Sequence, residues 1–91
     1  MATRCSTQVT IVNALGLHAR PAARLAQLCQ QFHSRIELRQ ETKTADASSV
    51  LALLMLASSQ GKSVEVIAEG DDAETAMQAV VQLIANGFEE G

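Results

Sequence analysis

The spacing of the apolar residues changes along this chain, and the change sets the order of its secondary structure. In residues 7–12, 35–39 and 63–69, apolar and polar residues alternate, which is typical of a strand with one buried face. In residues 19–31, and again from residue 73 onward, apolar residues recur every third or fourth position, which indicates helices. The inward-facing strand residues are expected to be Val9, Ile11, Ile36, Leu38, Val64, Val66 and Ala68.

Two further elements are expected between residues 40 and 60. A short polar strand is expected at residues 43–46. Ser48 and Ser49 precede a run rich in Leu, Ala and Met at residues 50–56, and serine at this place favours a helix start because its hydroxyl can accept from first-turn amides. A buried strand is the competing interpretation of so short an apolar run. The helix is favoured because only Val50 in this run is β-branched.

The last helix carries signals at both of its ends. Asp71 with Glu74 resembles a capping box. Gly87 follows the last apolar residues, where a left-handed helix cap is expected, and Phe88 is expected to fold back onto the final turn. The full order is therefore β-α-β-β-α-β-α, which predicts an α+β fold for residues 1–91 as one domain. Four antiparallel strands would form a sheet covered on one face by three helices.

Composition excludes several classes of protein. Of the 91 residues, 47% are hydrophobic and 19% are charged, which favours a packed globular core over a disordered chain. The net charge is −3 and no basic stripe is present, so nucleic acid is not expected as a partner. The longest apolar run, residues 50–57, is too short to span a membrane. No signal peptide is recognisable at the start, so a cytoplasmic protein is expected.

The cysteines and histidines do not form a recognisable metal motif. Cys29 and His33 are four residues apart and could share a helix face, and Cys5 is the only other cysteine. However, Cys29 lies on the predicted apolar stripe, and the paired ligand spacings typical of tetrahedral zinc are absent. Neither a metal nor a cofactor is expected. Both cysteines are expected to be free thiols, as in a reducing cytoplasm.

One segment contains residues that suggest chemistry and not only a structural role. Residues 16–22 read Gly-Leu-His-Ala-Arg-Pro-Ala and stand where a loop passes into the first helix. Pro21 suits a first turn, where its missing N–H costs nothing. His18 would then be the N-cap residue. The unpaired amides that follow it, with the positive end of the helix dipole, make a site for an anion.

The residue types in this segment point to phosphoryl chemistry. The helix field disfavours an imidazolium, so His18 is expected to be neutral and nucleophilic. Arg20 adds a permanently charged fork that fits phosphate oxygens, next to the backbone amides of Ala19 and Arg20. The segment has no carboxylate to activate water, as a hydrolase would need. This pattern favours a histidine that accepts a phosphoryl group and keeps it.

Residues 16–22 resemble the phosphorylation-site signature of HPr, the histidine-containing phosphocarrier of bacterial phosphotransferase systems. The resemblance covers nearly the whole chain. Ser49-Val50-Leu51 is similar to the second signature of the family, around its regulatory serine, and the turn at residues 69–72 also matches. The family fold is an open-faced β-sandwich with the same order of elements.

Within this family, the chain is most similar to NPr, the nitrogen-branch paralogue group. Residues 49–56 and 86–90 carry that likeness. Sugar-branch HPr commonly has lysines along the first helix and beside the second, at positions that are here Gln27, Gln30 and Ala52. These replacements favour a partner surface selected by apolar contact over one selected by charge.

The resemblance implies a relay. Enzyme I of the nitrogen branch would transfer a phosphoryl group to Nδ1 of His18, and His18 would pass it to an enzyme IIA-type protein, with no cofactor. Arg20 and the amides of Ala19 and Arg20 would bind the phosphate, in a chain expected to be monomeric. About half of residues 50–56 is expected to lie in the core. The docking surface is expected to combine Leu17, Val50, Leu51, Leu54 and Met55 around His18, some of them exposed.

Three alternatives stay open on the sequence. Ser49 is either a simple helix cap or a regulatory site for a serine kinase and phosphatase, as in some members of the family. The chain is either a nitrogen-branch carrier or a sugar-branch HPr in carbohydrate uptake. It could also be a regulatory docking protein that transfers nothing. The presence of His18 favours a carrier, which acts stoichiometrically in the relay and not as an enzyme.

Overall fold

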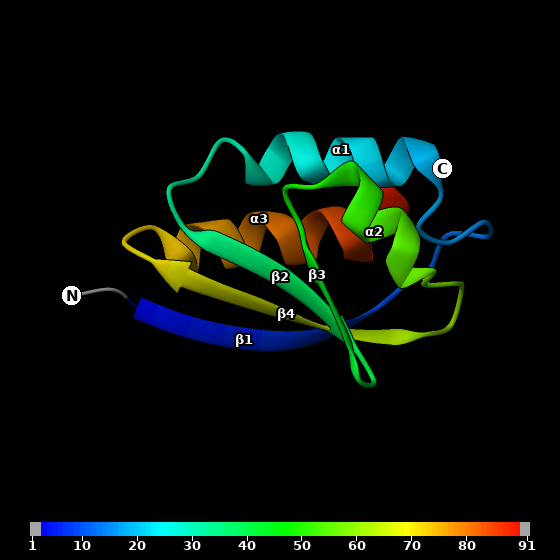
Figure 1. Ribbon diagram of the computed structural model, residues 1–91, viewed down its shortest axis with the longest axis horizontal. Coiled ribbons are helices and arrows are strands. Elements are labelled where there is room, and N and C mark those ends of the chain that lie inside the picture. The colour runs from blue at the N-terminus through cyan, green and yellow to red at the C-terminus, as the bar shows by residue number, and fades with distance from the viewer. Residues whose placement is uncertain (1–2, 90–91) are drawn as a thin grey trace.

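Four antiparallel strands form one sheet in the computed structural model, which describes residues 3–89 (Figure 1). Their order across the sheet is β1-β4-β2-β3, so β4 and β2 are central. Glu90, the last residue of the segment 86–90 that resembles NPr, lies outside the described residues. The predicted α+β architecture is confirmed. The bounds are β1 Thr3–Thr10, β2 Arg35–Gln40, β3 Lys43–Asp46 and β4 Ser63–Gly70.

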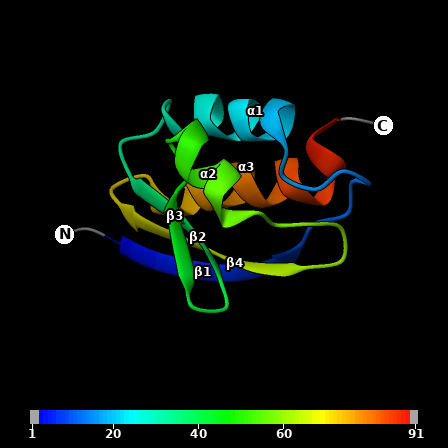
Figure 2. The ribbon, with the colours of Figure 1, turned by 45° about the vertical axis from the view of Figure 1, so that its right-hand side comes forward.

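Three helices cover one face of this sheet (Figures 1 and 2). They are α1 Ala19–Cys29, α2 Val50–Leu56 and α3 Ala73–Ala85, and a 3₁₀ turn, η1 Gly87–Glu89, follows α3. The helical interpretation of residues 50–56 is confirmed, whereas α1 ends two residues before the predicted residue 31. No helix within residues 3–89 is long and apolar enough to cross a membrane.

The core lies between the sheet and the helices. Every predicted inward residue of the two central strands is buried, from Ile36 and Leu38 to Val64, Val66 and Ala68. On the edge strand β1, Val9 is half-buried, and Ile11 is buried one residue beyond the end of β1. The prediction for β1 was wrong at both ends. The strand begins at Thr3, because residues 3–6 pair through their backbone with β4, as far as Thr3 opposite Gly70. It ends at Thr10 and not at residue 12.

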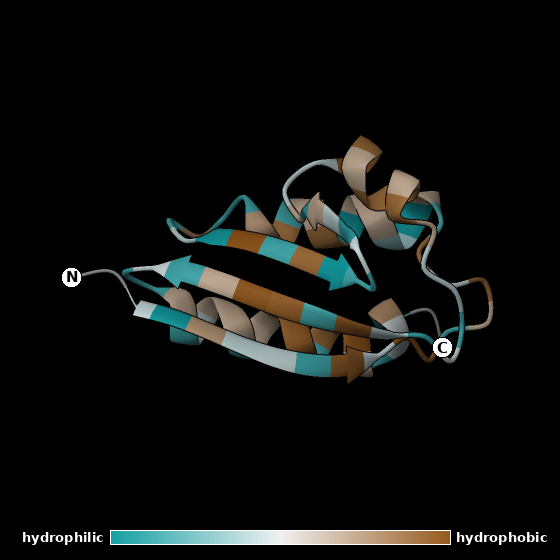
Figure 3. Ribbon diagram, turned by 60° about the horizontal axis from the view of Figure 1, so that its bottom comes forward, coloured by the Kyte–Doolittle hydropathy of each residue, from teal (hydrophilic) through white to brown (hydrophobic). Residues whose placement is uncertain are grey.

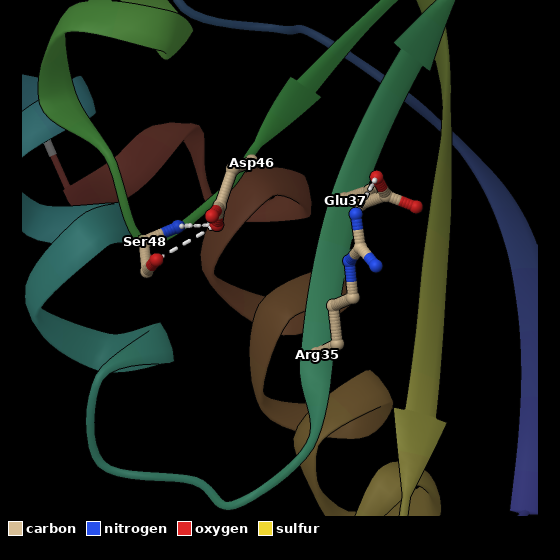
Figure 4. Close-up of polar contacts among 4 residues, drawn as sticks. All are labelled: Arg35, Glu37, Asp46 and Ser48. Atoms are coloured by element: carbon tan, nitrogen blue, oxygen red, sulfur yellow. Dashed lines mark hydrogen bonds and ion pairs between the residues drawn. The ribbon is translucent and has the colours of Figure 1, made fainter.

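The uncovered face of the sheet is polar except at its centre. Figure 3 views the strands from that side, with helices behind them. Ile67 of β4 stands opposite Ser6 of β1 and Glu37 of β2 and is 7% exposed. Arg35 and Glu37 form an ion pair at 3.4 Å on this face (Figure 4). Polar neighbours on both sides therefore cover the one apolar residue of this face.

The predicted capping box at the start of α3 is wrong. The N-cap residue is Asp72, not Asp71, and its side chain forms no hydrogen bond to the helix. Instead, its carboxylate accepts from the backbone N–H groups of His33 and Ser34, at 2.9 Å each, and from the Ser34 hydroxyl. This contact fixes the turn before α3 against the loop after α1. The turn can lie this close because residue 70 is glycine. A Cβ at this position would be only 2.6 Å from the Ser34 Cα.

The end of the described chain folds back as predicted. Gly87 has φ +65°, which favours glycine, and Phe88 is fully buried. Arg24 of α1 donates a hydrogen bond to the Phe88 carbonyl oxygen at 3.3 Å and lies 4.0 Å from the Glu89 carboxylate. These contacts hold η1 against the first helix.

Candidate functional site

His18 is the N-cap residue of α1, as the sequence predicts. Its backbone is extended, with φ −88° and ψ −169°, and its side chain forms no capping hydrogen bond to the helix. Its carbonyl oxygen accepts from the Ala22 N–H at 3.0 Å, which is the first bond of the helix. His18 therefore stands at the positive end of α1, directly before Ala19 and Arg20 of the first turn.

Arg20 lies in the first turn of α1 and is exposed, whereas Pro21 beside it is buried. Burial of Pro21 and Ala22 on the core side leaves Ala19 and Arg20 on the solvent side of the same turn. His18, the amides after it and the Arg20 guanidinium thus come from three consecutive residues at one helix end. This arrangement can bind a tetrahedral anion on backbone N–H groups and a guanidinium.

The β1–α1 loop, residues 11–18, is held by the turn that follows α2. The Leu17 N–H donates to the Ser58 carbonyl oxygen at 3.0 Å. Gly16 has φ +64°, and a Cβ there would lie 2.5 Å from that oxygen and 2.7 Å from the Ser59 Cα. Only glycine fits this position. The two segments lie side by side at one end of the molecule (Figures 1 and 2).

Further bonds fix the earlier part of this loop. The Gly16 N–H donates to the Asn13 carbonyl at 3.1 Å, and the Asn13 side-chain amide donates back to the Gly16 carbonyl at 2.7 Å. The Gln60 side chain donates to the Val12 carbonyl at 3.1 Å. His18 therefore follows a braced loop on one side and begins a packed helix on the other.

The exposed apolar surface of α2 is largely as predicted. Leu51 and Met55 are 68% and 69% exposed. Val50 and Leu54 are 38% and 39% exposed, whereas Leu53 and Leu56 are buried. Two of the seven residues thus lie in the core and Ala52 packs half-buried against it, which is less than the expected half. We call Val50, Leu51, Leu54 and Met55 the α2 patch.

The β1–α1 loop differs from expectation. Leu17, which the sequence placed on the docking surface, is only 3% exposed and packs in the core, so it offers a partner almost no area. Instead, Leu15 is 74% and Val12 is 46% exposed. Sequence reasoning missed both, since loop residues follow no periodicity that distinguishes inside from outside.

Ser49 is the N-cap residue of α2. Its hydroxyl accepts from the Ala52 N–H at 3.2 Å, which confirms the predicted cap geometry. The residues before it form a tight turn, in which Asp46 accepts from the Ser48 N–H at 2.9 Å and the Ser48 hydroxyl at 2.7 Å (Figure 4). These bonds lower the pKa of Asp46. Regulatory phosphorylation of Ser49 stays a prediction.

Both cysteines are free thiols, as expected. Cys29 is buried in α1, where burial first and the Asp46 charge second raise its pKa to about 12. Cys5 is half-buried and its thiol lies 3.6 Å from the Ala73 carbonyl oxygen. Among residues 3–89, no three His, Cys, Asp or Glu side chains are grouped so that they could hold a metal ion.

Comparison with known proteins assigns the chain to a family. A family model described as the PTS HPr component phosphorylation site matches residues 5–86. The phosphocarrier protein NPr of Shewanella violacea is 44% identical over 88 residues, which are 97% of each chain. That of Escherichia coli K12 is 48% identical over 83 residues, which are 90% of this chain and 92% of its own.

A solved structure gives the same assignment. The crystal structure of HPr-C-His from Thermoanaerobacter tengcongensis superimposes with a TM-score of 0.91 at 40% identity, over 96% of this chain and 98% of that one. The fold, the sequence and the family model agree over nearly the whole length. The chain therefore belongs to the HPr family of phosphocarrier proteins of the phosphotransferase system.

Proposed function

We propose that His18 accepts a phosphoryl group from phosphorylated Enzyme I and donates it to an enzyme IIA-type protein. The observation that carries this proposal is the position of His18 at the N-terminus of α1, with the exposed Arg20 two residues later. Three consecutive residues contribute a nucleophilic side chain, first-turn backbone amides and a guanidinium there. That is the set that a phosphoryl group needs for binding and transfer.

The transfer step needs positioning and charge stabilisation more than covalent assistance. A ring nitrogen of His18, Nδ1 by resemblance to the family, attacks phosphorus and forms an N–P bond. The N–P bond to the donor histidine breaks as this bond forms, so the phosphoryl group moves without release to water. Arg20 and the amides of Ala19 and Arg20 bind the phosphoryl oxygens. The onward step is the same exchange in the opposite sense.

A stoichiometric carrier fits this chain better than an enzyme with its own substrate. Residues 11–22 contain no carboxylate, and a hydrolase at this site would need a base to activate water. Without such a base, phospho-His18 can persist until a partner binds. The two unpaired cysteines fit a reducing compartment, and we place the relay in the cytoplasm.

We assign the relay to the nitrogen branch. The NPr proteins above are 44% and 48% identical to this chain. Gln27 on α1 and Gln30, the C-cap residue that follows it, are exposed, and a lysine at these positions would favour acidic partners. The α2 patch presents four exposed apolar side chains instead, which favours recognition by apolar contact.

Sugar uptake and phosphorylation-free docking are the competing functions. One experiment separates all three. The protein, beside His18→Ala, is incubated with phosphoenolpyruvate and either the nitrogen-branch or the sugar-branch Enzyme I, and its intact mass is measured. We expect an acid-labile gain of one phosphoryl group with the nitrogen paralogue only, and none in the variant. Labelling by the sugar paralogue alone would assign sugar transport, and no labelling by either would indicate a docking protein.

A further inference from the structure

Leu15 is the most exposed large apolar side chain among residues 3–89, at 74%. It stands three residues before His18 in the β1–α1 loop, and it belongs neither to the core nor to the α2 patch. A single exposed leucine is ordinary on a protein surface. Two further observations distinguish Leu15 from other exposed leucines. It lies close to the proposed acceptor His18 in the sequence, and hydrogen bonds fix the turn that carries it.

The turn that carries Leu15 has a fixed shape. Residues 13–16 form a β-turn in which the Gly16 N–H donates to the Asn13 carbonyl, and the Asn13 side chain donates back to Gly16. Asn at the first position and Gly at the fourth are favoured in such turns. Leu15 is held at the tip of this turn. A partner therefore meets an apolar group that needs little ordering on binding.

A hollow of about 530 Å³ adjoins this side chain. Its lining comes from the β1–α1 loop and from the end of α3. Val12, 46% exposed, is the other large apolar residue of this lining. Figure 3 shows hydrophobic stretches both on this loop and on α2. The large exposed apolar side chains of residues 3–89 thus form two groups, the α2 patch and the pair Val12 and Leu15.

The chemistry at His18 identifies what covers Leu15. Transfer between two histidines requires the partner's histidine to reach His18 directly, so the partner must cover the surface around it. Three residues span at most about 11 Å. A typical interface of about 800 Å² per protein has a radius of roughly 16 Å. Leu15 therefore lies within the footprint of a partner centred on His18.

We propose that Leu15, supported by Val12, is a specificity-determining contact for the proteins that exchange phosphoryl groups with His18. Each such partner presents an apolar side chain or pocket beside its own reactive histidine. This inference rests on the function proposed above. The contact selects partners by the match of apolar surface, and it is separate from Arg20, which binds the phosphoryl group.

The test separates docking from chemistry. Initial rates of phosphorylation by the nitrogen-branch Enzyme I are measured against concentration of the wild-type chain, Leu15→Gln, Leu15→Met, and Gln78→Ala, a change of an exposed residue on α3. We expect Leu15→Gln to raise KM about tenfold, as for the loss of one buried leucine contact. The maximal rate should change much less. Leu15→Met should restore most of the affinity, and Gln78→Ala should match the wild type.

Binding is then measured without turnover. Titration of His18→Ala and His18→Ala/Leu15→Gln with phosphorylated Enzyme I should show about tenfold weaker binding for the double variant. Equal affinities, or a lower maximal rate with unchanged KM, would overturn the proposal and make Leu15 a residue that shapes the loop. Thermal unfolding of Leu15→Gln should match the wild type, because the side chain is mostly in solvent. Failure of the relay itself is distinct, since the wild-type chain would then not be labelled at all.

Discussion

The backbone N–H of Leu17 donates a hydrogen bond of 3.0 Å to the carbonyl oxygen of Ser58. This bond ties the residue before His18 to the turn that ends α2. The helix that offers the exposed apolar patch and the loop that carries the proposed acceptor are therefore one braced unit. A partner that docks on α2 meets His18 at a set position, which is the condition for efficient transfer.

Gly16→Ala tests this brace. The new Cβ would stand 2.5 Å from the Ser58 carbonyl oxygen at φ +64°, so the two segments must separate. Gly61→Ala is a matched control, because Gly61 has φ +88° but nothing within 4 Å of the added Cβ. We expect the control to lose about 1–2 kcal/mol of unfolding free energy and Gly16→Ala to lose about 1–3 kcal/mol more. Urea unfolding measures both, and equal losses would contradict the close packing.

Arg20 is predicted to act through the geometry of its guanidinium and not through charge alone. Arg20→Lys keeps the charge but loses the planar fork that binds two phosphoryl oxygens. Charge-assisted hydrogen bonds contribute about 1.5–3 kcal/mol each, so we expect Arg20→Ala to slow phosphorylation of His18 by about 10–100-fold. Arg20→Lys should recover only part of that rate. Rates from rapid-quench measurements with Enzyme I check this, and full activity of Arg20→Ala would remove Arg20 from the site.

Ser49 is predicted to stabilise α2 as its cap without taking part in transfer at His18. Ser49→Ala removes the acceptor for the Ala52 N–H and should cost about 1 kcal/mol of unfolding free energy. Enzyme I should phosphorylate His18 of the Ser49→Ala variant at a rate close to that of the wild type. Ser49→Asp keeps a capping oxygen and adds a negative charge beside the α2 patch, so it should retain stability while weakening partner binding. Unchanged binding by Ser49→Asp would argue against a regulatory role.

Asp72 is predicted to make stability depend on acid pH. The Ser34 hydroxyl first, and then the His33 amide, lower the pKa of Asp72 below its ordinary value of 3.8. A lowered pKa in the folded state contributes stability above the unfolded pKa, and this contribution is lost as pH falls through the folded value. Asp72→Asn should therefore lower the thermal midpoint at neutral pH. The difference in thermal midpoint between Asp72→Asn and the wild type should become smaller as pH falls below about 4. A difference that does not change with pH would contradict the assignment.

The sequence predicted the central part of this fold because one-sided burial leaves a visible pattern. Strands β2 and β4 alternate apolar and polar residues, and the helices repeat on one face. The start of β1 left no such signal, since Thr3 to Ser6 pair through the backbone at an edge and bury little. The cap of α3 was misassigned because a tertiary contact with Ser34 engages the Asp72 carboxylate, which no local pattern shows.

At the site, the positions of His18, Arg20 and Ser49 followed from local helix rules. The orientation of the loop leucines did not. Leu17 turns into the core because its N–H is bound to Ser58, and Leu15 turns out because it is at the tip of the turn from Asn13 to Gly16. The position of Leu17 depends on a contact between segments more than forty residues apart in sequence. The position of Leu15 depends on a turn, whose residues follow no periodicity. A single sequence read by periodicity cannot resolve them.

The most direct test of the account maps the phosphoryl group. The chain has two histidines, and His33 is exposed after α1, so His33→Ala is a matched control for His18→Ala. After reaction with phosphoenolpyruvate and Enzyme I, phosphorus NMR with tandem mass spectrometry should locate one phosphoramidate on His18. His33→Ala should be labelled like the wild type and His18→Ala not at all. Phosphate on His33, on a serine, or persisting in His18→Ala would contradict the account.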